Sequence, residues 1–421
     1  MNTNATPSER PGMLSLDEAL RRLVEGAHAA VIRETETVST FDALGRVLAE
    51  PVHSLVDVPP GDNSAMDGYA MRAADVPAAG TVLPVSQRVP AGVVGTPLQP
   101  GTAARIFTGA QIPPGADAVV MQEQCEALDG AVRINTVPTP GLSVRKRGED
   151  VKGGAVVLDK GVRLMPQALG LAASVGAGQL VVLRRPRVAL FSTGDELAMP
   201  GEVPPEAMKP GAIYNSNRFT LRGLLQAAGC EVVDLGIVPD QLEATRDALR
   251  RAAATADLIV TSGGVSVGEE DHLKPAVQAE GQLDLWQIAI KPGKPLAFGS
   301  VRKPGAGQAL FLGLPGNPVS SFVTFLLAGR TVLHALQGME ASLPKALPLR
   351  ADFELKKADP KRREFLRVRL NAEGGVELFG NQGSGVLTSA VWADGLVDLA
   401  AGRLVSRGDT VPFLPLAQLL S

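Results

Sequence analysis

The sequence has few of the residues that support several common kinds of protein chemistry. Only two of its 421 residues are cysteines, Cys125 and Cys230, and they lie far apart without metal-ligand spacing. This pattern is typical of free thiols in a reducing compartment and argues against a disulfide framework. The four histidines also share no ligand spacing, which argues against a zinc site and against histidine-based catalysis.

Aromatic residues, an excess of charge and long apolar runs are also scarce. Aromatics make up 4% of the chain and the formal net charge is −3, so nothing in the composition favours nucleic-acid binding. The polar N-terminus lacks the apolar core of a signal peptide. The most apolar stretch, residues 169–183, is too short and too interrupted to span a bilayer. We therefore expect a cytoplasmic protein without a nucleic-acid or membrane partner.

The chain has the length and composition of a multidomain globular protein. At 421 residues it is too long for a single hydrophobic core, and its length predicts about three domains. Its 46 glycines and 32 prolines are spread along the sequence, which indicates many turns between short elements rather than one disordered tract.

The first half of the chain begins with helical segments and continues into short β-like runs. A capping box at Ser15 and Glu18 predicts a helix with its apolar face toward a core. A second short helix is expected near residues 41–48. Short β-like runs between residues 81 and 135 predict a small antiparallel β domain. A helix at 166–175 and a strand at 179–183 are expected to pack back on the N-terminal helices, which makes the β domain an insertion.

Between residues 188 and 336 strands alternate with helices, which predicts a doubly wound parallel sheet. Asp240 is expected to cap a helix that begins at Leu242. Asn317 and Pro318 are expected to begin a long helix as its N-cap and first helical residue. Beyond Gly338 the sequence returns to short β runs, which predict a small C-terminal barrel or sandwich.

Four loops in the α/β region follow strands, at the edge where open sheets of this kind bind ligands. They span residues 193–196, 262–264 with Asp271, 291–295 and 315–318. Together they supply oxygen donors for a cation, ammonium groups for phosphate and a helix N-terminus for an anion. We interpret the Ser-Gly-Gly turn at 262–264 and the acids after it as a site for phosphate and Mg²⁺.

Each of these features also has a purely structural interpretation. Asp195 and Glu196 could cap a helix, and Lys291 and Lys294 could belong to a solvated turn. Asp62 and Asp67, on a Gly-rich loop in the first half, could bind Mg²⁺, act as acid and base, or form an Asx turn. Thr108 and Asp150 share that ambiguity, and the arginines at 362–369 could form a solvated β face.

Seven stretches in order carry a resemblance to a known family. They are DNSAMDGYA at 62–70, RIFTG at 105–109, RGED at 147–150, STGDEL at 192–197, SGGVSVG at 262–268, KPGKP at 291–295 and LPGNPVS at 314–320. On these motifs the chain closely resembles the molybdopterin molybdenumtransferases of the MoeA and gephyrin E-domain type. The likeness extends over nearly the whole chain, from about Leu14.

The resemblance implies a multidomain α/β protein that forms an elongated homodimer. A central, mostly parallel sheet domain of the molybdopterin-binding type would be joined by an N-terminal mixed helical domain, an inserted β-rich domain and a small C-terminal β-barrel. The implied boundaries are 14–57 and 148–185 for the N-terminal domain, 58–147 for the insertion, 186–338 for the α/β domain and 339–421 for the barrel. The site would lie between the α/β domain of one subunit and the insertion of the other.

The implied reaction inserts molybdenum from molybdate into adenylylated molybdopterin, depends on Mg²⁺, and releases AMP and molybdenum cofactor. By the same resemblance the catalytic residues are Asp62, Thr108, Asp150 and Glu196. Metal ligands are Asp62, Glu196 and Asp271. Substrate-binding residues are Ser262, Gly263, Gly264, Ser266, Asp271, Lys291, Lys294, Pro315, Pro318, Ser320 and Arg363. A molybdopterin adenylyltransferase and molybdoenzyme chaperones are the implied partners.

Two other functions are compatible with parts of the sequence. Enzymes that adenylylate molybdopterin resemble the α/β region alone, so the loops around Asp62 and Asp150 argue against that reaction. A scaffold role, as gephyrin-type domains have in anchoring receptors, would use an extra domain or linker that this sequence does not contain.

Overall fold

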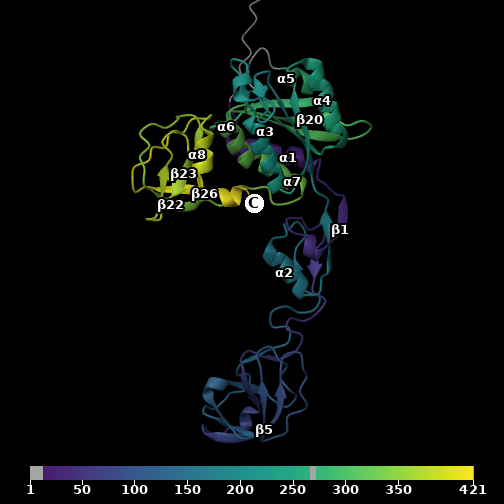
Figure 1. The fold of residues 1–421 in the computed structure, drawn as a ribbon, viewed down its shortest axis with the longest axis vertical. Coiled ribbons are helices and arrows are strands. Elements are labelled where there is room, and N and C mark those ends of the chain that lie inside the picture. The colour runs from purple at the N-terminus through teal and green to yellow at the C-terminus, as the bar shows by residue number, and fades with distance from the viewer. Residues whose placement is uncertain (1–12, 266–271, 421) are drawn as a thin grey trace, which may run out of the picture. The chain divides into compact units, whose positions relative to one another are not determined.

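A computed structural model describes residues 13–265 and 272–420 of the chain. The predicted site residues Ser266 and Asp271 lie outside these described residues. The chain divides into two compact units. The first comprises Met1–Glu36, Gly45–Val47 and Leu183–Ser421, and the second comprises Thr37–Leu44 and Leu48–Val182 (Figure 1).

The first unit contains a six-stranded sheet covered by helices on both faces (Figure 1). In spatial order its strands are β16 (Glu231–Val238), β13 (Arg187–Thr193), β17 (Leu258–Ser262), β21 (Gln308–Leu314), β20 (Pro295–Arg302) and β18 (Gly281–Gln287). The first four are mutually parallel, which confirms the doubly wound prediction for them. The sheet is mostly parallel, as expected, and departs from parallel pairing at one edge. There β20 and β21 are antiparallel, because residues 303–307 are too few for a crossover helix.

Alternating residues of the central strands belong to two hydrophobic cores. Val188 and Leu190 pack with α1 (Leu16–His28), α3 (Ser216–Ala227) and α7 (Arg330–Leu336). Ala189 and Phe191 face the opposite core, which α4 (Leu242–Thr255) and α5 (Leu273–Glu280) cover. Because both faces of the strand are buried, its sequence is continuously apolar rather than alternating.

The helices of this unit begin largely where their capping residues predict. Ser15 Oγ accepts a hydrogen bond from Glu18 N at 3.2 Å and starts α1, as predicted. The prediction that Asp240 is the capping residue of α4 is not confirmed, since Gln241 occupies the N-cap position, and the Gln241 side chain makes no capping bond. Asn317 does stand at the N-cap of α6 (Pro318–Thr324), but its side chain makes no capping bond.

The helical segment Pro318–Leu336 is the longest apolar helix among the described residues. It combines α6, a π-helical turn (Phe325–Gly329) and α7. Its length and composition would allow it to cross a membrane, but 89% of its most apolar window is buried inside the protein. It is therefore packed as a core helix of the α/β domain.

The C-terminal strands close into a small barrel. The strands β23 (Arg363–Leu370), β24 (Gly375–Leu378), β22 (Leu347–Ala351), β26 (Thr410–Pro415) and β25 (Gly395–Leu399) pair in that order, and β25 pairs again with β23. The predicted barrel is thus confirmed. The sequence interpretation missed β25 and the short helix α8 (Leu387–Trp392). A two-residue strand, β19 (Ile290–Lys291), adds to β23 from the α/β domain.

The second unit contains a β-rich region and a smaller mixed region. The first has six strands in the order β7 (Ala118–Met121), β4 (Gly68–Met71), β6 (Ala103–Ile106), β5 (Thr81–Val89), β9 (Ala131–Ile134) and β8 (Cys125–Leu128). All these pairs are antiparallel as expected except β5–β6, which is parallel. In the second region α2 (Pro166–Ser174) packs on its own apolar cluster.

The predicted helix near residues 41–48 is wrong. Only a single 3-10 turn, Thr40–Asp42, forms there, and Gly45 follows it with a φ of 74°. A left-handed residue ends a right-handed helix, so the segment cannot continue as one. The helix α1, which we grouped with residues 148–185, packs in the core of the α/β domain. The five-segment domain division itself remains a prediction.

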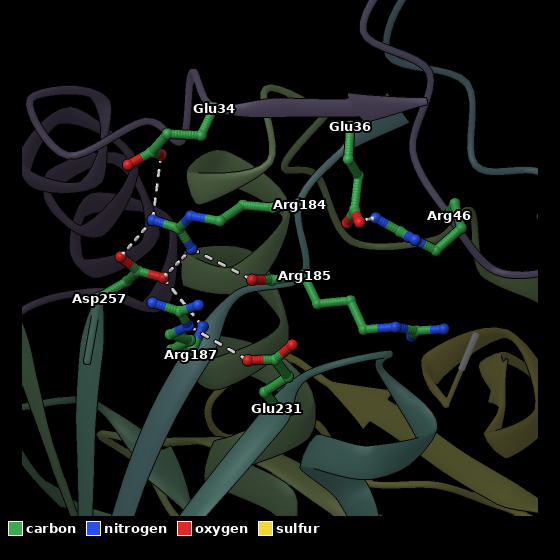
Figure 2. A network of polar contacts seen from close by, with 8 residues as sticks. All are labelled: Glu34, Glu36, Arg46, Arg184, Arg185, Arg187, Glu231 and Asp257. Atoms are coloured by element: carbon green, nitrogen blue, oxygen red, sulfur yellow. Dashed lines mark hydrogen bonds and ion pairs between the residues drawn. The ribbon is translucent and has the colours of Figure 1, made fainter. Parts of the chain in front are cut away.

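A buried polar network anchors the amino edge of the sheet. Figure 2 shows the guanidinium of Arg184 between the carboxylates of Glu34 and Asp257. Arg184 donates two hydrogen bonds to Asp257, at 2.7 and 2.9 Å, and Arg187 N donates a third at 2.9 Å. Since Asp257 directly precedes β17, this network fixes the edge of the sheet opposite to the predicted ligand site.

Candidate functional site

Three of the four predicted loops of the α/β domain meet at the carboxyl edge of its parallel strands. The strands β13, β17 and β21 end in register, with Ser192 opposite Ser262 and Ser262 opposite Leu314. The hydroxyl groups of Ser192 and Ser262 are 3.3 Å apart, and Gly263 N donates to Leu314 O at 3.1 Å. The loops that follow these strands therefore share one surface.

Two glycines, Gly263 and Gly264, form the base of this surface, which we call the floor, and leave its backbone accessible. Gly263 and Gly264 have φ values of 90° and 66°. A β-carbon on Gly263 would lie 3.1 Å from Thr193 O, and one on Gly316 would lie 3.7 Å from the Gly263 Cα. Because Gly263 N–H is engaged with Leu314 O, the N–H of Gly264 is the donor of this turn that remains for an anion. The Ser262–Gly264 turn thus suits a phosphate group.

Glu196 supplies a carboxylate in the loop that follows β13. Its carboxylate folds back over Gly194, where a β-carbon would lie 2.5 Å from Oε2. The side chain is exposed and forms no hydrogen bond or ion pair with the described residues. No group of three potential metal ligands forms in the described ranges. Mg²⁺ nevertheless fits here, because it takes one or two carboxylates together with phosphate oxygens.

Two asparagines at the start of α3 bury polar atoms that have no partner among the described residues. Asn217 Nδ2 donates to Gly316 O at 2.7 Å, which identifies Oδ1 as its remaining acceptor, and that oxygen is buried without a hydrogen bond. Asn215 caps α3 through Oδ1, and its Nδ2 is likewise buried and unpartnered. Thr261 Oγ1 is also buried and forms no hydrogen bond with the described residues. Such atoms call for a ligand or water.

Sequence reasoning missed Asn217 as a site residue. It stands in the first turn of a helix, two residues after the N-cap Asn215, and nothing local marks it as a contact of another loop. Only the tertiary structure shows that the side chain holds the carbonyl of Gly316, which belongs to a loop 99 residues further along the chain.

The Lys291–Lys294 loop packs against the first turns of α6. Gly293 has a φ of 107°, and a β-carbon there would lie 2.2 Å from Thr324 Oγ1 and 3.5 Å from Ser320 O. Lys291 Nζ forms an ion pair with Glu364 Oε1 of the barrel at 2.7 Å, while Lys294 is exposed. The predicted residues Lys291, Lys294, Pro318 and Ser320 therefore belong to one neighbourhood. Pro315 lies in the adjoining turn after β21.

Arg363 is already engaged by carboxylates. Its guanidinium donates to both oxygens of Asp398 and to Asp17 Oδ1 at 3.2 Å. The hydrogen bonds from Arg363 to Asp398 raise the pKa of the guanidinium above its usual value. These contacts compensate its charge, so its predicted role toward molybdate, which remains a prediction, would require them to open.

The remaining predicted residues lie together in the second unit. Asp62 accepts hydrogen bonds from Lys146 Nζ and Arg147 N, both at 2.9 Å, and the Lys146 bond, aided by the second, lowers the pKa of its carboxyl group. Thr108 donates through N and Oγ1 to Asp67. Gly109 N and Ile112 N bond to carbonyls of Ser64 and Asp62, so these two loops run side by side.

Asp150 is exposed in the same unit, where its backbone N–H donates to Val58 O at 3.0 Å. Within the described residues its carboxylate forms no hydrogen bond or ion pair. The structure therefore places Asp62, Thr108 and Asp150 in the second unit, and Glu196 with the glycine and lysine loops in the first.

Comparison with known proteins identifies the family. Residues 14–176 match the MoeA N-terminal region (domain I and II), residues 189–335 a probable molybdopterin binding domain, and residues 348–416 the MoeA C-terminal region (domain IV). A molybdopterin molybdenumtransferase of Haemophilus influenzae is 40% identical over 419 residues, which cover 97% of this chain and 100% of the relative. The chain belongs to the molybdopterin molybdenumtransferase family.

Other relatives agree with this assignment. A molybdopterin molybdenumtransferase of Nostoc is 37% identical across 91% of this chain and 89% of its own length. The crystal structure of a molybdopterin biosynthesis MoeA protein from Pyrococcus horikoshii OT3 matches with a TM-score of 0.79 and 29% identity, covering 96% of this chain and 99% of that one. This molybdopterin molybdenumtransferase is therefore an enzyme of molybdenum cofactor biosynthesis.

Proposed function

We propose that this enzyme inserts molybdenum from molybdate into adenylylated molybdopterin in a Mg²⁺-dependent reaction that releases AMP. The observation that carries the proposal is that the Gly263–Gly264 floor, the free carboxylate of Glu196 and the Lys291–Lys294 loop belong to one unit, with the lysine loop packed on α6. Phosphate, a divalent cation and an oxyanion are the three charged components of that reaction, and this donor set suits all three.

The residues of the first unit act by binding and orienting. The backbone at Gly263 and Gly264 would hold a phosphate of the pterin substrate, and the ammonium groups of Lys291 and Lys294 would offset the charge of the anions. Ser320 would donate its hydroxyl to an oxyanion. No nucleophilic side chain is needed, because placing the two substrates in contact accounts for much of the acceleration.

Glu196 would hold the Mg²⁺ together with phosphate oxygens, and Asp271 and Asp62 are proposed as further ligands. The bound cation would neutralise the charge that develops on the phosphoanhydride when AMP leaves. Asp62 would have to exchange its bond with Lys146 for the metal. Glu196 would instead supply a carboxylate that has no such bond to break before it binds the metal.

Asp62, Thr108 and Asp150 of the second unit would complete the site. We propose that they do so across a homodimer, with the insertion of one subunit serving the α/β domain of the other. The enzyme is proposed to work in the cytoplasm, to receive its substrate from a molybdopterin adenylyltransferase and to deliver the product to molybdoenzyme chaperones.

The test is the release of AMP from adenylylated molybdopterin in the presence of molybdate and Mg²⁺. Glu196→Gln should lower the rate by about 100-fold, as expected for a group that acts on transition-state charge. It should also raise the Mg²⁺ concentration needed for half-maximal rate. Glu202→Gln, an exposed glutamate of the same loop, is the matched control. No AMP release by the wild type would contradict the proposed reaction and favour a scaffold role.

A further inference from the structure

Arg367 is a buried cation that has no carboxylate partner among the residues the structure describes. It is 1% exposed and is the largest fully buried side chain among the described residues. Its guanidinium donates to three neutral acceptors: Ser389 Oγ at 3.1 Å, Phe365 O at 3.3 Å and Gly383 O at 3.1 Å. Burial lowers the pKa of Arg367 to about 10, which still leaves it charged at neutral pH.

This arrangement is unusual because buried charges are normally paired. Every other arginine of β23 has an acid: Arg363 pairs with Asp398 and Arg369 pairs with Glu377. Arg367 and Phe365 lie on the outer side of the barrel, because Leu366 and Val368 belong to the barrel core and side chains alternate along a strand. An anion bound close by would supply the missing countercharge.

The hydrogen bonds of Arg367 hold one loop in place. The Gln382 side chain accepts a hydrogen bond from Arg367 N at 2.9 Å and donates one to Arg367 O at 3.0 Å. The backbone of β23 therefore also binds the loop. The Gly383–Ser384 peptide is trans, so its N–H points opposite to the carbonyl that faces Arg367. The N–H groups of Ser384 and Gly385 have no acceptor within the described part of the chain.

The loop lies against the helix that carries Ser320. Ser384 O accepts from Val319 N at 2.9 Å, which joins the loop to the first turn of the helical segment Pro318–Leu336. Ser320 in that turn is 4% exposed, and the Lys291–Lys294 loop packs on it through Gly293. The loop of Ser384 and Gly385 and the Lys291–Lys294 loop, which are distant in sequence, thus both contact the helical segment that carries the Ser320 hydroxyl.

We propose that Arg367 is a positioning residue for a tetrahedral dianion. It fixes residues 382–385 so that the N–H groups of Ser384 and Gly385 donate to the anion, and it contributes the buried positive charge that the anion balances. The inference deepens the proposed function and rests on it for the ligand, whose chemistry molybdate and the phosphate of the pterin substrate share.

Equilibrium binding to the full-length protein distinguishes these sources, with molybdate and AMP as the two probes measured by titration calorimetry. Arg367→Met keeps the side-chain volume but removes the charge and all three hydrogen bonds. It should lower the affinity for at least one of the two probes tenfold or more. A loss confined to molybdate identifies molybdate as the anion, and a loss confined to AMP identifies a phosphate. Arg369→Met, an equal change of charge on the same strand, should leave both affinities within about twofold.

A second variant separates positioning from packing. Arg367→Lys restores the charge but cannot reach Gly383 O, Phe365 O and Ser389 together, because a lysine lacks the planar fork of donors. We expect it to fold even where Arg367→Met does not, and to recover only part of the lost affinity. Hydrogen exchange at the amides of residues 383–387 should rise in both variants.

Unchanged affinity for both probes in a folded Arg367→Lys or Arg367→Met protein would overturn the inference and leave Arg367 a purely structural residue. Wild-type protein that binds neither probe would overturn it as well. In that case, AMP release from adenylylated molybdopterin by the same protein would show that the proposed function stands without this anion site.

Discussion

Lys291 and Glu364 form an ion pair between the α/β domain and the C-terminal barrel, with Nζ and Oε1 2.7 Å apart. The two partners differ in environment, since Glu364 is 2% exposed whereas the lysine side chain remains partly in solvent. Glu364 Oε2 also accepts from Asp359 N at 3.1 Å. A buried carboxylate therefore directs a proposed anion-binding lysine.

Glu364→Gln should weaken this connection. The amide can still accept from Asp359 N, but its NH₂ would then face the ammonium of Lys291. We expect a loss of about 1–2 kcal/mol in the free energy of unfolding, less than for a fully buried pair because Lys291 is partly solvated. Urea denaturation measures it. Glu354→Gln, which breaks an exposed pair with Lys356, should cost less than about 0.5 kcal/mol.

Gly293→Ala should displace the Lys291–Lys294 loop. The new β-carbon would lie 2.2 Å from Thr324 Oγ1, which is fully buried, and the residue would keep a φ of 107°. Overpacking and backbone strain together predict a loss of about 2–4 kcal/mol in unfolding free energy. We also expect a raised KM for molybdate, measured through AMP release.

Gly305→Ala serves to separate the overpacking cost of Gly293→Ala from its backbone-strain cost. Gly305 has a φ of 90°, but a β-carbon on it would have no neighbouring atom within 4 Å, so only the backbone cost of about 1 kcal/mol applies. Adding Thr324→Ala to Gly293→Ala should recover the steric part. Equal losses in Gly293→Ala and Gly305→Ala would argue against packing of the lysine loop on α6.

Asn217→Asp should disturb the Gly316 turn and the phosphate floor together. A carboxylate cannot donate to Gly316 O, and it adds a negative charge next to Gly263. We expect a loss of about 1–3 kcal/mol in unfolding free energy and weaker AMP binding. Asn215→Asp is the charge-matched control, because its Oδ1 can still cap α3. If both variants bound AMP equally well, Asn217 would have no special place in the site.

Asp257 should make the stability of the first unit sensitive to acid. Burial alone would raise the pKa of Asp257, but hydrogen bonds from Arg184 and Arg187 N outweigh it and hold that pKa below its ordinary value. The ionised carboxylate therefore stabilises the fold fully above about pH 4, the ordinary pKa of aspartate. This stabilisation is lost as the pH falls through the lower pKa of the folded state.

The measurement compares Asp257→Asn with wild type by urea denaturation between pH 7 and pH 3. The variant should lose about 2–4 kcal/mol at pH 7, because Arg184 loses its buried partner and keeps only the exposed Glu34, and the difference should shrink below about pH 4. Asp247→Asn, which breaks an exposed pair with Arg250, should cost less than about 0.5 kcal/mol at every pH. A difference that stays constant down to pH 3 would contradict the depressed pKa.

Local patterns sufficed to predict those elements whose causes are local. The Ser15–Glu18 capping box starts α1 because the bond spans three residues, and the apolar runs of β13 and β17 reflect burial on both faces. The glycines at 263 and 264 indicated a phosphate turn because left-handed backbone itself favours glycine. The family motifs extended this reasoning to residues such as Glu196 and Lys291.

Local patterns failed at two helix boundaries and at one side chain whose partners are distant in sequence. A helix expected at 41–48 gives way to a single turn because Gly45 is left-handed, and Asp240 lies one residue before the true N-cap. Arg363 looked free in the sequence, whereas the folded chain pairs it with Asp398 and Asp17, which lie 35 and 346 residues away.

The sequence by itself determined the family, the doubly wound α/β domain, the barrel and the glycine and lysine loops, because each is encoded in short-range patterns or ordered motifs. Only the tertiary structure decided that Asn217 holds Gly316, that Glu364 directs Lys291 and that Arg367 is buried with no acid from the described residues beside it. These relationships join residues tens to about a hundred positions apart, and their energies depend on burial. Burial is a property of the folded chain, since it arises only when distant segments exclude water from one another.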